Sequence, residues 1–293
     1  MFESIRINKF KTAFITFLVT LFVMFFVYFI ASYTGFGVYS VPMALLVSLG
    51  SSFFSYFYSD KIVLKLSGAK PADYETQRKL TNIMEGLCVS SGMPMPKLYV
   101  IQDASPNAFA TGRNYKNAVV CVTTGLLDRL NYYELEGVLA HELAHIKNYD
   151  ILLSTVISVM LGMVVILADI FTRASFFRGG VRDDDDNKSS GIFIIFGFLF
   201  AMLAPLASEL MKMALSRNRE YLADATAIEF TRNPQGLADA LRKISDANIP
   251  VQRASRATEN MYIANPFSAN RVMELFSTHP PIQKRIDAIL NIK

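Results

Sequence analysis

The chain has 293 residues, of which 52% are hydrophobic and 18% are charged, and its formal net charge is +4. Ordinary soluble domains carry about 25% charged residues, so this composition indicates a membrane protein. The small positive charge is not gathered into long basic runs, which argues against a nucleic-acid-binding protein. The cysteines Cys88 and Cys121 stand outside any metal-ligand spacing, and we interpret them as small buried side chains in a reducing compartment.

Residues 1–59 predict two membrane-spanning helices. No charged residue occurs from Thr12 to Ser59, and a spanning helix needs about 20 apolar residues. The turn-prone sequence YTGFGVYSVP divides this run, so we expect spans near 12–32 and 41–58. The first apolar stretch exceeds the core of a signal peptide and no A-x-A site follows, so we expect an uncleaved anchor.

A second hydrophobic pair lies within 151–213, with segments at 151–171 and 191–208 around a polar loop at 172–190. Together with the first pair, it predicts a four-helix integral membrane protein. Asp169 ends the third segment and Glu209 follows the fourth. Charges at these places leave open re-entrant or protein-buried helices, and therefore a protein with only two spans.

Basic residues beside the spans predict their orientation, because such residues stay on the cytoplasmic side. They precede the first span and follow the second and fourth spans: Arg6, Lys9, Lys11, Lys61, Lys65, Lys212, Arg217 and Arg219. We therefore expect these ends to face the cytoplasm, and the short uncharged loop at 34–40 to lie on the other side of the membrane.

The remaining sequence predicts one folded domain, mainly α with a small β-sheet, formed by residues 60–150 and 214–293. Short strands are expected at KLYVIQD, NAFAT and NAVVCVT, which alternate or run apolar between turn residues. A helix is expected from about Tyr132, with Asn131 as its cap and Glu134 three residues later, a variant of the capping box.

This helix carries the sequence HELAH, in which His141 and His145 are four residues apart. A helix projects such a pair from one face, where both imidazoles can bind one metal ion. Glu142 is rotated about 100° from His141, so it cannot be a further ligand of that ion. The metal would lower the pKa of a water molecule, and Glu142 would take its proton and later pass it to the leaving amine.

A catalytic zinc site normally needs a third protein ligand. Position 151 is Ile, which excludes a third histidine at the spacing of the extended motif. The residues leave Asp150, His279 and an acidic residue on a later helix as candidates. We favour the segment 216–230, where Glu220 and Asp224 share one helical face and alanines keep the helix slim.

Four segments in this order, PNAFATG, HELAHIKNYD, SRNREYLADA and STHPPIQKRI, resemble the HtpX family of membrane-bound zinc endopeptidases, relatives of the CAAX prenyl protease. The resemblance covers nearly the whole chain and implies a gluzincin-type metalloprotease domain with one Zn²⁺. It implies zinc ligation by His141, His145 and Glu220, with Glu142 as the general base. Asp224 would then orient a ligating histidine, or be a surface charge. His279 would support the oxyanion of the transition state, or be an ordinary residue beside two prolines.

The same resemblance suggests a role for Asn107, Ala108, Phe109, Ala110 and Thr111. In gluzincins an edge strand near the metal pairs with the substrate backbone. These residues are therefore expected to hold an extended peptide, unless they form an internal, fully paired strand.

The leading hypothesis is a zinc metalloendopeptidase of the bacterial cytoplasmic (inner) membrane that cleaves misfolded or damaged membrane proteins. Its partners would be polypeptides and the lipid bilayer, with no nucleic acid. Because the helix with His145 is expected to run almost directly into the span at Ile151, the metal should lie near the membrane surface. The rival hypotheses are a non-catalytic transporter that uses Asp169 and Glu209, or a scaffold with a structural metal. Prenyl-protein processing is a lesser alternative, because four spans are few for a chamber that encloses a lipid.

Overall fold

The computed structural model describes residues 2–33, 36–160, 217–252, 258, 261–264, 266 and 280–292. Most of the predicted second hydrophobic pair lies outside the described residues, and so do the loop at 172–190 and His279.

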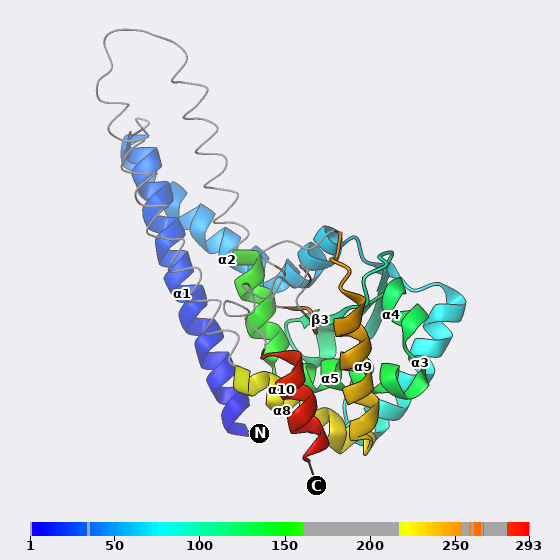
Figure 1. Cartoon of the computed structure of the whole chain (residues 1–293). Coiled ribbons are helices and arrows are strands. Elements are labelled where there is room, and N and C mark those ends of the chain that lie inside the picture. The colour runs from blue at the N-terminus through cyan, green and yellow to red at the C-terminus, as the bar shows by residue number, and fades with distance from the viewer. Residues whose placement is uncertain are drawn as a thin grey trace.

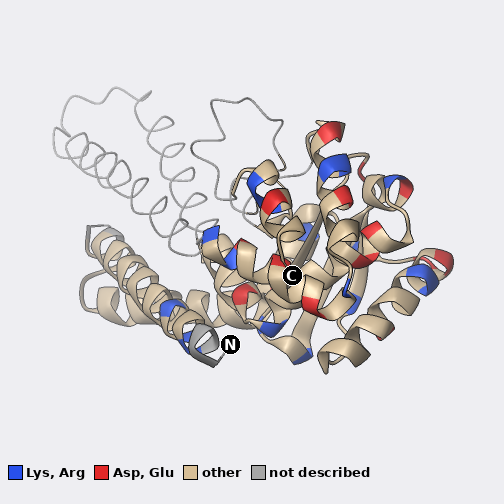
Figure 2. Cartoon of the chain, turned by 60° about the horizontal axis from the view of Figure 1, so that its bottom comes forward, with Lys and Arg blue, Asp and Glu red and all other residues tan. Residues whose placement is uncertain are grey.

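Helices α1 (Phe2–Tyr33) and α2 (Ser40–Ser67) lie side by side and extend from the body of the molecule (Figure 1). Both are long and apolar enough to cross a membrane, over Arg6–Phe29 and Gly37–Ser67. Only 22% and 17% of their most apolar windows are buried, whereas the core helix of a soluble protein is mostly buried. The two helices therefore fit a membrane protein, and Figure 2 shows them with few charged residues away from their ends.

Small side chains form the face of α2 that is buried, at a spacing that keeps them on one side: Ser40, Ala44, Ser48, Ser55 and Ser59. Small residues let helix backbones approach closely inside a membrane. A hydrogen bond of 2.6 Å between the hydroxyls of Thr20 and Ser52 joins the two helices. The pair thus packs by close contact and one polar bridge.

Helix α2 does not end where its hydrophobic span ends. It continues past the predicted limit near 58 and the expected domain boundary at 59 to Ser67, where Gly68 adopts φ 68° and its N–H donates to Leu64 and Lys65. A left-handed glycine is a common helix stop. The charges of Asp60, Lys61 and Lys65 end the apolar run but not the helix.

The predicted small sheet is confirmed as four mixed strands in the order β1-β2-β4-β3. The strands are β1 (Lys70–Pro71), β2 (Lys97–Ile101), β3 (Ala108–Gly112) and β4 (Ala118–Thr123). Strands β2 and β4 are parallel, and the other two pairs are antiparallel. Strand β3 therefore lies at one end of the sheet. Helices α3 (Tyr74–Ser91) and α4 (Thr124–Arg129) flank these strands in the chain.

Helix α5 (Tyr132–Lys147) crosses the middle of the domain and packs against the sheet, α8 (Arg217–Thr231) and α9 (Pro234–Ala247) (Figure 1). The predicted capping box is present, since Asn131 accepts from Glu134 N–H and Glu134 accepts from Asn131 N–H. The side chains of Leu135, Leu139 and Leu143 are fully buried. These contacts fix the helix that carries the HELAH sequence. Helix α10 (Ile282–Leu290) closes the domain beside α8 and α9.

After α5 the chain turns at Asn148 and Tyr149 and starts a new helix over Asp150–Met160. Tyr149 has φ 60°, a left-handed conformation that a bulky residue rarely adopts. Apolar residues of the new helix pack against α1: Leu152, Leu153, Val156, Ile157 and Met160 contact Ile15, Val19 and Val23. The predicted continuation is thus interrupted by a sharp corner.

Candidate metal centre and active site

His141, His145 and Glu220 bring three possible ligand atoms within 4.8 Å of one another. The two Nε2 atoms of α5 are 3.1 Å apart. The Glu220 carboxylate of α8 lies 3.7 Å from His141 Nε2 and 3.6 Å from His145 Nε2. The histidines are one turn apart on α5, and buried alanines, Ala223 and Ala227, let α8 approach. The structure thus brings together the three residues that the sequence predicts as ligands.

The opposite nitrogen of each imidazole contacts a carboxylate. His141 Nδ1 lies 2.9 Å from Asp224 Oδ1, and His145 Nδ1 lies 3.0 Å from Asp150 Oδ2. A carboxylate accepts the Nδ1 proton, so each Nε2 presents a lone pair. In the neutral rings these two lone pairs, 3.1 Å apart beside a carboxylate, would repel one another, and a cation between them, either a proton or a metal ion, removes the repulsion. Two nitrogens and an oxygen are a donor set that Zn²⁺ accepts, so the residues present fit a zinc ion.

Burial and charge act in opposite directions on the histidines. Burial lowers the pKa of His141, although its hydrogen bond to Asp224 acts against this. Burial also disfavours the charged form of His145, but the hydrogen bond to Asp150 and the charge of Glu220 outweigh it and raise the pKa of His145 to about 9. The cause is the concentration of carboxylates around the ring, and the same field attracts a divalent cation.

Asp224 is held by Arg285, a residue that the sequence analysis did not single out. Arg285 is fully buried on α10 and donates from Nε to Asp224 Oδ2 at 2.9 Å and from Nη2 to Oδ1 at 2.7 Å. Burial alone would raise the pKa of Asp224, but the Arg285 guanidinium and the bond to His141 hold it well below its usual range. Asp224 is therefore a buried, charged partner of His141 and not a surface charge.

The sequence contains a pattern that indicates a buried position for Arg285. Ile282, Arg285, Ile286 and Ile289 follow the i, i+3, i+4, i+7 pattern of one helical face, and the last three are buried in the structure. An arginine in the apolar stripe of a helix needs a buried anionic partner.

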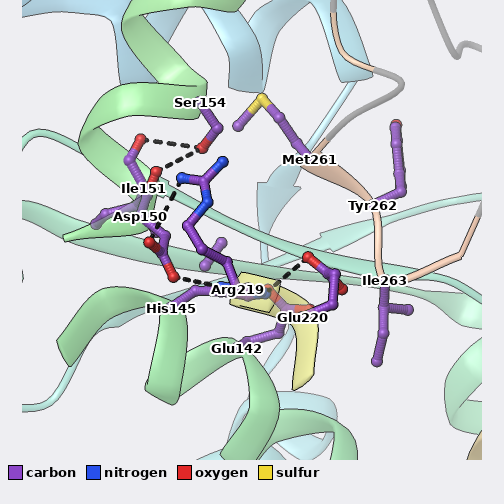
Figure 3. A pocket seen from close by; sticks show the side chains of 11 residues that line it. Glu142, His145, Asp150, Ile151, Ser154, Arg219, Glu220, Met261, Tyr262 and Ile263 are labelled. Atoms are coloured by element: carbon purple, nitrogen blue, oxygen red, sulfur yellow. Dashed lines mark hydrogen bonds and ion pairs between the residues drawn. The ribbon is translucent and has the colours of Figure 1, made fainter. Parts of the chain in front are cut away.

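Glu142 lines the pocket drawn in Figure 3 together with His145 and Glu220, and it is 1% exposed. Burial raises the pKa of its carboxyl to about 7, although His145 and the backbone of Ala110 act against this. Its Oε1 has no hydrogen-bond partner among the residues that the structure describes. A buried carboxylate oxygen without a partner indicates a site for water or a ligand.

The pocket lies between the candidate ligands and the sheet edge. Glu142, His145 and Glu220 lie on one side of it, and Tyr262 and Ile263 lie on another (Figure 3). Ala110 of β3 also lines it. The pocket therefore brings Glu142 and two of the candidate ligands next to the backbone of β3.

Strand β3 has an outer side that the chain itself partly covers. The Ile263 N–H donates to the Ala108 carbonyl at 2.9 Å, and Phe109 forms a bridge with Tyr262. Asn107 donates from its side chain to the Ala264 carbonyl at 3.1 Å. Backbone groups alternate in direction along a strand, so Ala110, like Ala108, directs its backbone away from β4. The role of 107–111 in binding substrate stays a prediction, and further along this side the Gly112 N–H donates to Thr155 Oγ1 at 3.4 Å.

Comparison with known proteins gives the family. The model of peptidase family M48 matches residues 74–293, which include every residue of the centre described above. The chain belongs to peptidase family M48.

Relatives narrow the assignment within M48. A Protease HtpX homolog of Dictyoglomus turgidum is 46% identical over 285 residues, covering 97% of this chain and 92% of that protein. A Protease HtpX homolog of Ligilactobacillus salivarius is 42% identical over 295 residues and covers 99% of both chains. The predicted HtpX resemblance is confirmed, and this M48 peptidase is a membrane-associated metalloendopeptidase that acts on polypeptides.

The fold has a solved counterpart. The crystal structure of S. mikatae Ste24p matches with a TM-score of 0.53 and 18% identity, covering 99% of this chain and 67% of that chain. At this identity the likeness concerns the fold, which is mainly helical with a small mixed sheet in the chain described here. The family assignment decides against the transporter and scaffold hypotheses, because an M48 peptidase is an enzyme.

Proposed function

We propose that this M48 peptidase is a zinc-dependent endopeptidase of the bacterial inner membrane that cleaves misfolded or damaged membrane proteins on the cytoplasmic side. The observation that carries the proposal is the buried Glu142 carboxylate, which faces a pocket beside two converging Nε2 atoms and Glu220.

His141, His145 and Glu220 would hold one Zn²⁺ per chain, and Asp224 and Asp150 would keep the imidazoles in the tautomer that leaves Nε2 free. When bound, zinc would supply Lewis acidity, polarising the scissile carbonyl and making water a better nucleophile. The chain contributes rigid placement of these groups, because the side chains of His141, Asp224 and Arg285 are all buried.

Glu142 would act as the general base and then as the general acid. Its raised pKa, about 7, lets it accept a proton from the attacking water near neutral pH and release it to the leaving amine. The exclusion of water that raises this pKa also keeps the transferred proton within the site. His279, outside the described residues, keeps its proposed role as a donor to the oxyanion.

The substrate would lie extended beside β3 at Ala110, which lines the pocket together with Glu142. Backbone pairing at a strand edge reads no side chain, so it suits a protease with many substrates. This is the chemistry that clearing misfolded chains requires.

The N-terminal end of α1 supports a position of the active site near the membrane surface. Arg6, Lys9 and Lys11 lie at its N-terminal end, which the distribution of basic residues assigns to the cytoplasm. Asn8 and Lys9 at this end contact the corner that follows His145. We propose that α1, α2 and the segments 151–171 and 191–208 form four spans, with the active site at the cytoplasmic surface.

The test compares wild type with Glu142→Gln in detergent, with Glu136→Gln, half-buried on the same helix, as the matched control. Zinc content and cleavage of an unfolded protein are measured with and without a chelator. We expect all three proteins to bind zinc, and Glu142→Gln alone to lose activity, by about a thousandfold. Equal cleavage by Glu142→Gln and wild type, or cleavage that a chelator leaves unchanged, would contradict the proposal.

A further inference from the structure

We propose that the N-terminal membrane helix completes the metal centre, with Asn8 as a positioning residue that holds Asp150 against His145. The proposal rests on the proposed function, because it concerns the same zinc site. It extends that site into a helix that the family model, which begins at residue 74, does not include.

Asn8 is a buried polar residue near the start of a largely apolar helix, 4% exposed. Its Nδ2 donates to Asp150 Oδ1 at 2.7 Å and to the Asn148 carbonyl at 3.1 Å. Both protons of the amide are thus used on one short segment, 140 residues away in the sequence. A side chain with such contacts fixes that segment and does not merely fill space.

Asp150 connects Asn8 to the candidate ligand. One carboxylate oxygen accepts from Asn8, and the other lies 3.0 Å from His145 Nδ1. Arg219 of α8 lies 3.5 Å from the same oxygen as Asn8. Because Asn8 makes the shorter contact, it anchors Oδ1 and leaves Oδ2 aimed at the imidazole. Without Asn8, the carboxylate is free to turn toward the Arg219 guanidinium and away from His145.

The corner before Asp150 is also held from α1. Tyr149 has the unfavourable φ of 60°, and a backbone in this region persists where its surroundings hold it. The Asn148 carbonyl accepts from Asn8, and the Lys9 ammonium lies 4.4 Å from the centre of the Tyr149 ring. Two consecutive residues of α1 therefore hold both residues of the corner.

Helix α1 thus acts on the metal centre through a chain of three side chains, from Asn8 through Asp150 to His145. Partners that orient a metal-binding histidine usually change metal affinity by about 10- to 100-fold when removed. Asn8 acts one step further out, so we expect an effect near the lower limit. The peptidase would then be fully assembled only when its first membrane helix is in place.

The experiment measures zinc affinity of the full-length, metal-stripped protein in detergent by competition with a chelator. The variants are Asn8→Leu, which keeps the side-chain volume but removes the amide N–H donors, and Asn8→Gln, which keeps those donors. We expect Asn8→Leu to weaken zinc binding about tenfold and to alter the visible spectrum of the Co²⁺-loaded protein, and Asn8→Gln to restore part of both.

Thr20→Val is the matched control. It removes a hydrogen bond of the same helix, to Ser52, far from the corner. Its zinc affinity should equal that of wild type. In an Asp150→Ala background, where the connecting carboxylate is gone, Asn8→Leu should have no further effect on zinc affinity.

Unchanged zinc affinity and an unchanged Co²⁺ spectrum in Asn8→Leu would overturn the proposal, even with a lower thermal midpoint, because Asn8 would then only support folding. An equal loss in Thr20→Val would overturn it as well. Should Asn8→Leu not accumulate, the same comparison is made with Asn8→Ser. Failure of wild type to bind zinc would instead refute the proposed function, so the two failures are distinguishable.

Discussion

Arg285 and Asp224 form a buried, doubly hydrogen-bonded ion pair directly behind His141, with distances of 2.9 and 2.7 Å. Arg285 Nη1 also donates to the Ile263 carbonyl at 3.0 Å. One guanidinium therefore links the proposed metal ligand to the segment that closes the pocket. This explains why an arginine stands in the apolar face of α10.

Replacing Arg285 by Met should destabilise the protein by about 3–5 kcal/mol, because Asp224 would remain as a buried charge without its partner. The stability of Arg285→Lys should lie between those of wild type and Arg285→Met, since an ammonium keeps the charge but cannot form the two parallel hydrogen bonds. Thermal unfolding of the metal-free protein measures both. Adding Asp224→Asn to Arg285→Met should recover stability but not zinc affinity, and equal stability of Arg285→Met and wild type would contradict this account.

Zinc should stabilise the folded protein, because the donor set is assembled only in the folded state. At free zinc about a thousandfold above its dissociation constant, the gain is about 4 kcal/mol. The measurement is the thermal midpoint with and without zinc. Glu220→Gln should lose most of the gain, whereas Glu229→Gln, exposed on the same helix, should keep it. An equal gain in both variants would remove Glu220 from the ligand set.

Close packing of α5 against α9 depends on Gly137. A Cβ at this position would lie 2.8 Å from the backbone of Leu237, so Gly137→Ala must push the helices apart and should cost about 1–3 kcal/mol. Gly86→Ala on α3 is the control, because its Cβ would meet nothing within 4 Å. It should be neutral or stabilising by up to about 1 kcal/mol. Equal unfolding midpoints for the two variants would contradict the close contact.

The two thiols should differ in reactivity. Burial raises the pKa of Cys88, and raises that of the fully buried Cys121 well above its ordinary value. Because the thiolate reacts, alkylation of Cys88 should increase as the pH rises through and above the ordinary thiol range. Cys121 should react only after unfolding. Mass spectrometry of the alkylated peptides measures this, and labelling of Cys121 in the folded protein would contradict its position in the core.

Local features of the fold could be predicted from the sequence because they depend on neighbouring residues. The capping box of Asn131 and Glu134 marks the start of α5, and the spacing of His141 and His145 places both imidazoles on one face. The short apolar segments at 97–101 and 118–123 form strands as expected. In each case hydrogen bonds and burial follow a short period along the chain.

Contacts between distant segments could not be predicted in this way. Asn8 lies 142 residues before Asp150, and nothing in the composition of α1 indicates that its one buried amide reaches the catalytic domain. The sequence leaves Asp150 as a candidate for the third metal ligand. In the structure Asp150 instead contacts Nδ1 of His145, the ring nitrogen that does not face the other candidate ligands. The left-handed backbone conformation of Tyr149 could not be predicted, because tyrosine is not a typical turn residue. Such features depend on packing, which periodicity does not encode.

The continuation of α2 to Ser67 bears on the distance between the catalytic domain and the proposed membrane surface. From Asp60 to Ser67 the helix rises about 10 Å at 1.5 Å per residue, and only Gly68 and Ala69 separate it from β1. A flexible linker would let the catalytic domain sample many distances from the bilayer, whereas in the proposed topology this helix would act as a fixed spacer. A substrate anchored in the same membrane would then be cut at a set number of residues from where it leaves the lipid, whatever its sequence there.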